Sequence, residues 1–191
     1  MANCGVSSGH AIQCRNFMPG IKRFYLAPFF SGTTSSELLT YTVDSNNVIT
    51  AATLSSGSFY TFDLTKESGD YQEAIHVNAT NGTVSYEGTF SAYLANYSTA
   101  LRNKIVASAK GRMYLIFEDR NGQFFLCGTD GTGTNPSASM GVDMGESTAT
   151  PGKAYAGDPN GYNLVFNFTE KLPPIEISSS VVASISTPAT N

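Results

Sequence analysis

The sequence predicts a mainly β fold, interrupted once by a short helix and organised as one domain. The 191 residues include only 14% charged residues, and the 12% that are aromatic are all Phe or Tyr. Ser, Thr, Gly and Asn supply the polar surface instead, which is typical of β proteins. Apolar and polar residues alternate from Thr83 to Leu94, and Asn-Gly pairs at 81–82 and 121–122 indicate tight turns. A chain of this length can bury one sizeable core, so a single domain is expected over residues 1–174.

Apolar runs bounded by turn residues predict the strands of the first half of the chain. The run that begins at Ile21 stops before Pro28, which cannot donate a hydrogen bond to a sheet. Two further runs flank a polar tip of a kind that tolerates positive φ, and this pattern predicts a hairpin. The tip consists of Asp44, Ser45, Asn46 and Asn47. The predicted strands are 21–27, 38–43, 48–54, 58–65 and 71–77.

The clearest strand begins at Thr83. Its alternation places five apolar residues on one face: Val84, Tyr86, Phe90, Ala92 and Leu94. At about 3.3 Å per residue, twelve alternating positions span about 40 Å, which is about twice the usual strand length. We therefore expect this strand to cross most of the domain.

The helix is predicted at about residues 96–110. Asn96 or Ser98 can cap its N-terminus, and Leu101 and Ile105 lie on one stripe. Gly111 is predicted to end the helix with a positive φ. Because so short a helix is unstable alone, it is expected to lie against a sheet.

The second half of the chain predicts a central hairpin, a long loop and a closing strand. The hairpin strands, 113–119 and 124–127, are almost continuously apolar and are therefore expected inside a sheet. Residues 128–160 are rich in Gly, Ser, Thr and Pro and show no periodicity, which predicts a long loop. The closing strand is 162–171. Residues 175–191 are predicted to be a tail that is extended or disordered until assembly.

The cysteines and the termini provide little functional signal. Cys4, Cys14 and Cys127 are odd in number and lack metal-ligand spacing, so we expect reduced thiols. The N-terminal residues contain no apolar signal segment, and no apolar run approaches the roughly 20 residues that a membrane span needs. Synthesis and folding in a cytoplasm, with no membrane partner, are expected.

No residue pattern predicts catalysis, so the protein is not expected to be an enzyme. His10 and His76 lack the spacing of a metal site or a catalytic triad. Glu118 and Asp119 lie beside an Asn-Gly turn, where a solvated hairpin end is expected. The segment GTDGTG at 128–133 lacks the Lys-Ser/Thr of a phosphate-binding loop.

Metal and nucleic-acid binding are not predicted either. The aspartates of the long loop, at 130, 143 and 158, do not have the spacing of a calcium loop, so neither a metal nor a cofactor is expected. A net charge of −4 and a pI of about 5.1 lack the basic surface of a protein that grips nucleic acid.

Three segments carry a resemblance to a known family. They are CGVSSGHAIQCRNFMPGIKRFYLAPF, TVSYEGTFSAYLANYSTALRNKIVASAKGRMYLIFEDRNGQFFLCG and GDPNGYNLVFNFTEKLPP, which together extend over residues 4–174. The chain resembles a family of virion structural proteins of tailed bacteriophages, particularly those of Bacteroidetes-type hosts. These proteins in turn resemble tail tube subunits through their architecture.

The resemblance implies a fold and a function. It implies a tail-tube-like β-sandwich or partly closed barrel with one flanking helix, whose copies form hexameric rings that stack into a tube. The partners would be other copies of the chain and other tail or connector proteins, and the location would be the virion tail. DNA would pass nearby without specific binding, which the acidic character of the chain fits.

The expected contacts between rings lie in polar loops. They are the hairpin tip (Asp44, Ser45, Asn46, Asn47) and the long loop (Asp130, Asn135, Met140, Met144), and the C-terminal tail is a third expected contact. Two other functions stay open. One is a different virion role, such as capsid decoration or head–tail joining. The other is a carbohydrate-binding adhesin, for which exposed Trp would be expected, whereas Trp is absent.

Overall fold

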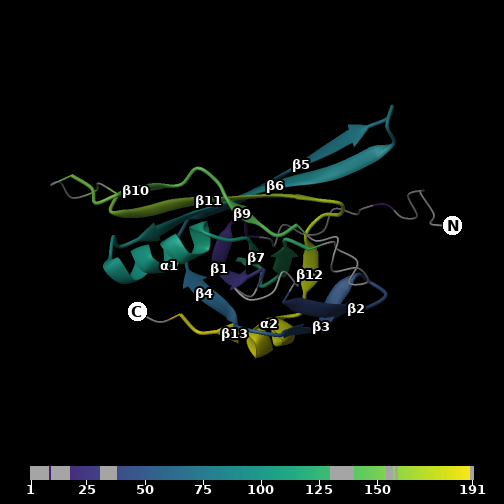
Figure 1. The fold of residues 1–191 in the computed structure, drawn as a ribbon, viewed down its shortest axis with the longest axis horizontal. Coiled ribbons are helices and arrows are strands. Elements are labelled where there is room, and N and C mark those ends of the chain that lie inside the picture. The colour runs from purple at the N-terminus through teal and green to yellow at the C-terminus, as the bar shows by residue number, and fades with distance from the viewer. Residues whose placement is uncertain are drawn as a thin grey trace.

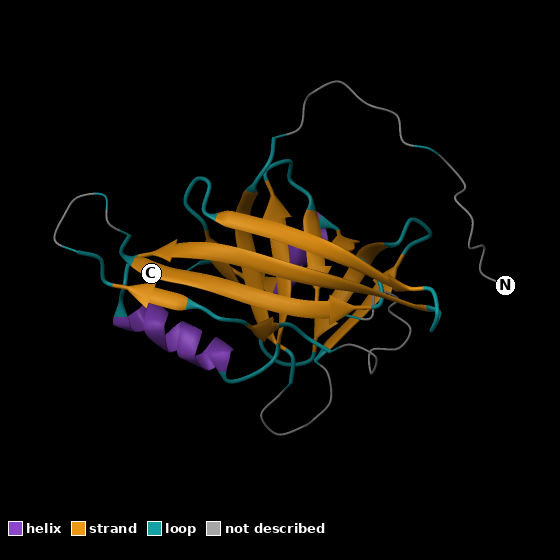
Figure 2. Ribbon diagram, turned by 90° about the horizontal axis from the view of Figure 1, so that it is seen from above, coloured by secondary structure: helices purple, strands orange, loops and turns teal. Residues whose placement is uncertain are grey.

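Two β-sheets pack face to face in the computed structural model, which describes residues 9, 18–30, 38–129, 140–153, 157 and 159–189 (Figure 1). The larger sheet is curled and has eight strands, in the order β13-β4-β1-β7-β8-β12-β3-β2. The smaller sheet has the order β10-β11-β6-β5, with β9 also paired to β11. Its long strands cross over the larger sheet (Figure 2). The predicted mainly β fold, a sandwich or partly closed barrel, is confirmed.

The larger sheet takes strands from both ends of the chain. Its strands are β1 (Ile21–Pro28), β2 (Leu39–Val43), β3 (Val48–Leu54), β4 (Phe59–Asp63), β7 (Met113–Asp119), β8 (Phe124–Cys127), β12 (Ile175–Ile177) and β13 (Ser186–Thr187). β1 and β7 lie in the middle and pair with each other antiparallel. The predicted hairpins β2–β3 and β7–β8 both form.

The smaller sheet is built from three long antiparallel strands and two short ones. The strands are β5 (Gly69–Asn78), β6 (Thr83–Ala95), β9 (Asp143–Met144), β10 (Thr148–Thr150) and β11 (Gly161–Glu170). β6 pairs with β5 on one side and with β11 on the other over ten positions each.

Two apolar clusters form the core, one on each face of the larger sheet. Between the sheets, alternate residues of β6 and β11, such as Phe90 and Phe166, pack against Phe24 and Phe117. On the other face, residues of β1, β3, β4 and β7 pack with helix α2 (Ser179–Ile185), which buries Val181 and Val182. β7 therefore has both faces covered, which explains its continuous apolar run.

Helix α1 (Thr99–Ala109) lies at one end of the smaller sheet, at the left in Figure 1. The hydroxyl oxygen of Ser98 accepts a hydrogen bond of 3.2 Å from the backbone N–H of Leu101, so Ser98 is the N-cap. Leu101 and Ile105 pack, partly buried, against the core between the sheets. The predicted ending was wrong: the helix ends at Lys110 in a right-handed conformation, and Gly111 has no positive φ.

Three further expectations differ from the structure. Residues 175–187 form β12, α2 and β13 instead of an extended tail, so the described residues contain two helices and not the one expected. The predicted loop 128–160 contains β9 and β10, which pair with β11. These short segments have low intrinsic preference for their structure, and contacts with neighbouring strands determine it. Glu118 was expected in solvent but is 5% exposed.

Candidate assembly surface

The outward face of the smaller sheet is polar. Because Phe90, Ala92 and Leu94 point into the core, the residues between them on β6 point outward. The same alternation on β5 and β11 turns Gln72 and Asn167 outward. The side chains on this face contact one another: the hydroxyl of Thr89 lies 3.2 Å from Oδ1 of Asn167, and Nε2 of Gln72 donates to Asp70 at 2.9 Å.

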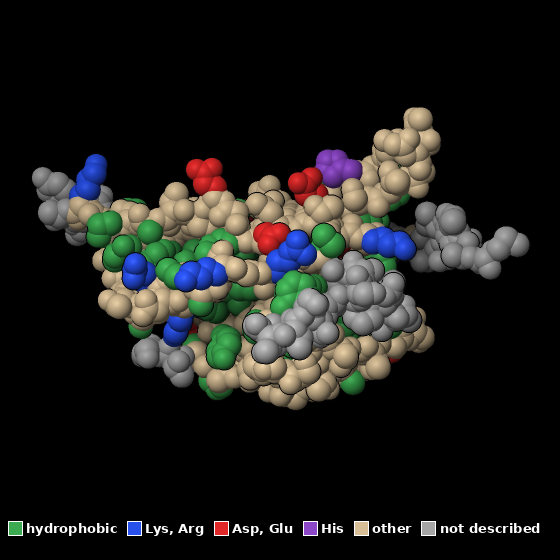
Figure 3. All heavy atoms as spheres, in the orientation of Figure 1, with side chains coloured by type: hydrophobic (Ala, Val, Ile, Leu, Met, Phe, Trp, Pro, Cys, Tyr) green, Lys and Arg blue, Asp and Glu red, His purple; other side chains and the backbone are tan. Residues whose placement is uncertain are grey.

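The smaller sheet carries negative charge and contains neither Lys nor Arg in any of its strands. Asp70, Glu87 and Asp143 lie on its outward face and are exposed. His76 lies 3.1 Å from Glu87 on the same face. Figure 3 shows carboxylates and the histidine along the upper surface of the molecule. Arg112, which precedes β7 in the larger sheet, forms an ion pair with Asp143, with its Nε 3.9 Å from Oδ1.

The hairpin of β5 and β6 projects beyond the other described strands and helices (Figure 1). We call its outer half, residues 73–87, the arm. On the core-facing side of the arm, Ile75, Val77 and Val84 are 60%, 69% and 46% exposed. Ile75 pairs with Tyr86 and Val77 with Val84. The arm therefore exposes an apolar face that nothing covers among the described residues.

Sequence reasoning missed the arm, although a signal was present. The alternation on β6 was interpreted as a strand that crosses the domain, but only its second half, from Gly88, is buried. The neighbouring strand β5 carries a matching apolar pattern, at Tyr71, Ile75 and Val77. Two paired strands of about twice the usual length exceed what one domain can cover, and that excess indicates a projection.

An apolar groove of about 570 Å³ lies between α1 and the ends of β1, β4 and β7. Leu26, Phe30, Tyr60 and Phe62 contribute apolar surface, and Tyr60 is 55% exposed. The cations that line it are Lys104, Lys110 and Arg112. Figure 3 shows hydrophobic side chains beside Lys and Arg side chains near α1. Helix α1, which borders the groove, and the arm lie toward opposite ends of the long axis of the molecule (Figure 1).

The predicted hairpin tip forms between β2 and β3. Its four residues are all exposed, and Asn47 has a φ of 62°. Oδ1 of Asp44 accepts hydrogen bonds from the backbone N–H groups of Asn46 (2.8 Å) and Val48 (2.9 Å). This carboxylate therefore stabilises its own turn, and the side chains of Ser45, Asn46 and Asn47 are exposed.

The other predicted contact residues that the structure describes, Met140 and Met144, differ in exposure. Met140 is 58% exposed, whereas Met144 on β9 packs, partly buried, against the core between the sheets. Asp130 and Asn135 lie outside the described residues, as do Cys4, Cys14 and His10. Cys127 is free and buried, and burial raises the pKa of its thiol.

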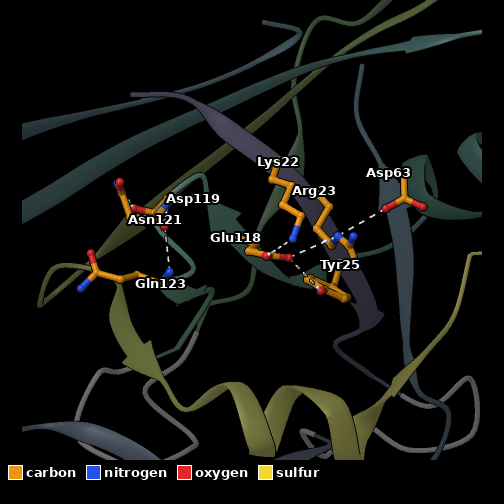
Figure 4. Close-up of polar contacts among 8 residues, drawn as sticks. All are labelled: Lys22, Arg23, Tyr25, Asp63, Glu118, Asp119, Asn121 and Gln123. Carbon is orange, nitrogen blue, oxygen red and sulfur yellow. Dashed lines mark hydrogen bonds and ion pairs between the residues drawn. The ribbon is translucent and has the colours of Figure 1, made fainter. Parts of the chain in front are cut away.

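A charged cluster joins the strands β1, β4 and β7 (Figure 4). A bulge in β1 brings both Lys22 and Arg23 to Glu118, with Nζ of Lys22 at 2.7 Å from Oε1 and Nε of Arg23 at 3.2 Å from Oε2. Arg23 also lies 3.3 Å from Asp63. Burial and the neighbouring Glu118 carboxylate raise the pKa of Tyr25, whose hydroxyl lies 3.5 Å from Oε2. These contacts link the strands β1, β4 and β7.

A second buried carboxyl, Glu170, ends β11. It is 7% exposed and accepts hydrogen bonds from the backbone N–H groups of Gly128 and Thr129. Its pKa is raised to about 8, mainly by burial and further by the nearby Glu73 carboxylate. The two hydrogen bonds act in the opposite direction and lower the pKa. Glu170 therefore anchors the chain segment that follows β8.

Within the described part of the chain, His, Cys, Asp and Glu side chains form no group of three or more that could hold a metal ion. None of the helices described there is long and apolar enough to cross a membrane. Comparisons of the chain with protein families, curated proteins and solved structures produced no match.

Proposed function

We propose that the protein is a tail tube subunit of a tailed bacteriophage, which assembles into stacked, hexameric rings that enclose a channel for DNA. The observation that carries the proposal is the outward face of the smaller sheet. It combines hydroxyl and amide side chains with Asp70, Glu87 and Asp143, and its strands contain no Lys or Arg. Such a surface repels phosphates and offers DNA no binding site, as a conduit requires.

The edges of the smaller sheet support assembly around a ring. β5 is an edge strand of ten residues, and β10 lies at the other edge. An exposed edge presents unpaired N–H and C=O groups, which favour pairing with another chain. Repetition of one such contact by rotation closes a ring, and stacking of the rings gives a filament. In this arrangement the acidic face lines the channel, and α1 lies at the flank.

The experiment is negative-stain electron microscopy of the purified, concentrated protein at neutral pH. Hollow tubes or stacked rings are the expected result. Single closed rings would support head–tail joining instead, and particles that stay monomeric at every concentration would contradict self-assembly.

The orientation of the sheet is tested by chemical protection. In a Cys4→Ser, Cys14→Ser background, Gln72→Cys on the acidic face is expected to react with a bulky polymer-linked maleimide as a monomer but not in tubes. Ser55→Cys, exposed on the turn after β3, is the matched control and should react in both states. Equal reaction of Gln72→Cys in both states would contradict a channel-lining face.

A further inference from the structure

Among the described residues, nothing covers the apolar face of the arm. Ile75, Val77 and Val84 are each at least 46% exposed, whereas Phe90, farther along β6, is fully buried. Contiguous exposed apolar side chains on a regular strand are typical of interaction sites. The arm face also carries Glu73, which is exposed and lies two residues from Ile75 on the same side of β5.

The groove beneath α1 has complementary properties. It is apolar at Leu26 and Phe62 and offers the exposed aromatic ring of Tyr60 at its opening. The lining cations, Lys104, Lys110 and Arg112, complement the carboxylate of Glu73. A volume of about 570 Å³ falls within the range of sites that bind ligands of drug-like size. It can therefore accept small aliphatic side chains.

The arm of a chain cannot reach its own groove, because the arm and helix α1, which borders the groove, lie toward opposite ends of the long axis (Figure 1). A neighbouring copy can satisfy both at once. We propose that the apolar face of the arm docks into the groove beneath α1 of a second copy. The contact joins unlike surfaces, so each copy gives one arm and receives another.

This inference rests on the proposed function, since it names a second contact between the copies, in addition to pairing at the edges of the smaller sheet. It specifies which two surfaces meet, the apolar face of the arm and the groove, and which charge each of them carries. The apolar pair Val77 and Val84 contributes burial, and attraction between Glu73 and the groove cations orients the arm and excludes a reversed docking.

Disulfide trapping tests the contact directly. In the full-length Cys4→Ser, Cys14→Ser background, Val77→Cys combined with Tyr60→Cys is expected to give a ladder of covalent multimers under mild oxidation. The control combines Thr83→Cys with Tyr60→Cys, because Thr83 lies at the same end of the arm but on its opposite face. A ladder from both pairs, or from neither, would overturn the inference.

Charge reversal provides an independent measurement. Glu73→Lys alone and the double change Lys104→Glu, Lys110→Glu alone are each expected to weaken association at least tenfold in sedimentation equilibrium. An equimolar mixture of the two variants should restore association, because every arm then meets a groove of opposite charge. Absence of restoration in the mixture would overturn the inference even if both variants are folded.

The outcomes separate this inference from the proposed function. Tubes of wild-type protein together with equal tubes of Val77→Lys would leave the tail tube function standing and overturn the docking. A specific Val77–Tyr60 ladder without rings or tubes would support the docking and contradict the tube.

Discussion

Val77 and Val84 pair with each other near the tip of the β5–β6 hairpin, and no described residue covers them, so that 69% and 46% of their surfaces are exposed. Changing both to Thr should alter the free energy of unfolding of the monomer by less than about 1 kcal/mol, because exposed positions contribute little. Phe90→Ala on the same strand should cost about 3–5 kcal/mol, since Phe90 is fully buried.

Urea denaturation at a concentration where the protein is monomeric checks this difference. A loss above about 2 kcal/mol for the two Thr changes would show that the arm packs within its own chain and is not free for a neighbour.

Gly88 and Gly111 should respond oppositely to replacement by Ala. A Cβ at Gly88 would lie 2.2 Å from the ring of Phe168, whereas a Cβ at Gly111 meets nothing within 4 Å. Overpacking at Gly88 should cost about 1–3 kcal/mol. Gly111→Ala should be neutral or stabilise by up to about 1 kcal/mol, because Gly111 lacks a positive φ and Ala restricts the unfolded chain.

Thermal unfolding of the two variants measures the contrast. If Gly111→Ala destabilised the fold as much as Gly88→Ala, the residue after α1 would need the left-handed conformation that the sequence pattern predicted.

Local patterns predicted most strands, because hairpin turns and alternation depend on neighbouring residues. The pair Asn121-Gly122 and the apolar run of β7 were sufficient to place a central hairpin. α2 was missed since Ser-Ser-Val-Val-Ala-Ser-Ile is a poor helix sequence, and packing of Val181 and Val182 in the core stabilises it. Alternation predicts which side a residue faces, but not what covers that side, so the free face of the arm required the structure.

The candidate site was predicted in part. The tip at Asp44 lies where the sequence placed it, because an Asp that accepts hydrogen bonds within its own turn is a local feature. The buried position of Glu118 depends on a bulge in β1, which moves Lys22 and Arg23 to the same carboxylate. No local pattern on β7 indicates a bulge in its partner strand.

Glu118→Gln should destabilise the fold by about 1–3 kcal/mol, because it removes the charge that compensates Lys22 and Arg23. The expected loss is below that of a fully buried pair, since the Lys22 side chain is 53% exposed. Asp63→Asn is the matched control. Asp63 contacts the same Arg23, but its side chain is 59% exposed, so the expected loss of folding stability is less than about 1 kcal/mol. If guanidinium denaturation showed equal losses of stability for Glu118→Gln and Asp63→Asn, Glu118 would not be the dominant carboxylate of the cluster.

Glu170 should make the stability of the fold depend on pH in an unusual direction. Its carboxyl pKa is raised from 4.5 to about 8 in the folded protein, with burial as the main cause. Below pH 4.5 both the folded and the unfolded state hold the proton, so the group has no effect. Between pH 4.5 and about 8 the unfolded state releases the proton while the folded state retains it, so rising pH favours unfolding. Above about pH 8 the full penalty, on the order of a few kcal/mol, is present.

Glu170→Gln should remove this dependence, because the amide is neutral and its oxygen can still accept the hydrogen bonds from Gly128 and Thr129. The variant should unfold at the same denaturant concentration as the wild type near pH 4 and at a clearly higher one near pH 9. Glu146→Gln, at an exposed position, is the control and should follow the wild type throughout. If the denaturant midpoints of wild type and Glu170→Gln changed in parallel from pH 4 to 9, Glu170 would ionise in the folded state at an ordinary pH. Its burial would then carry no penalty.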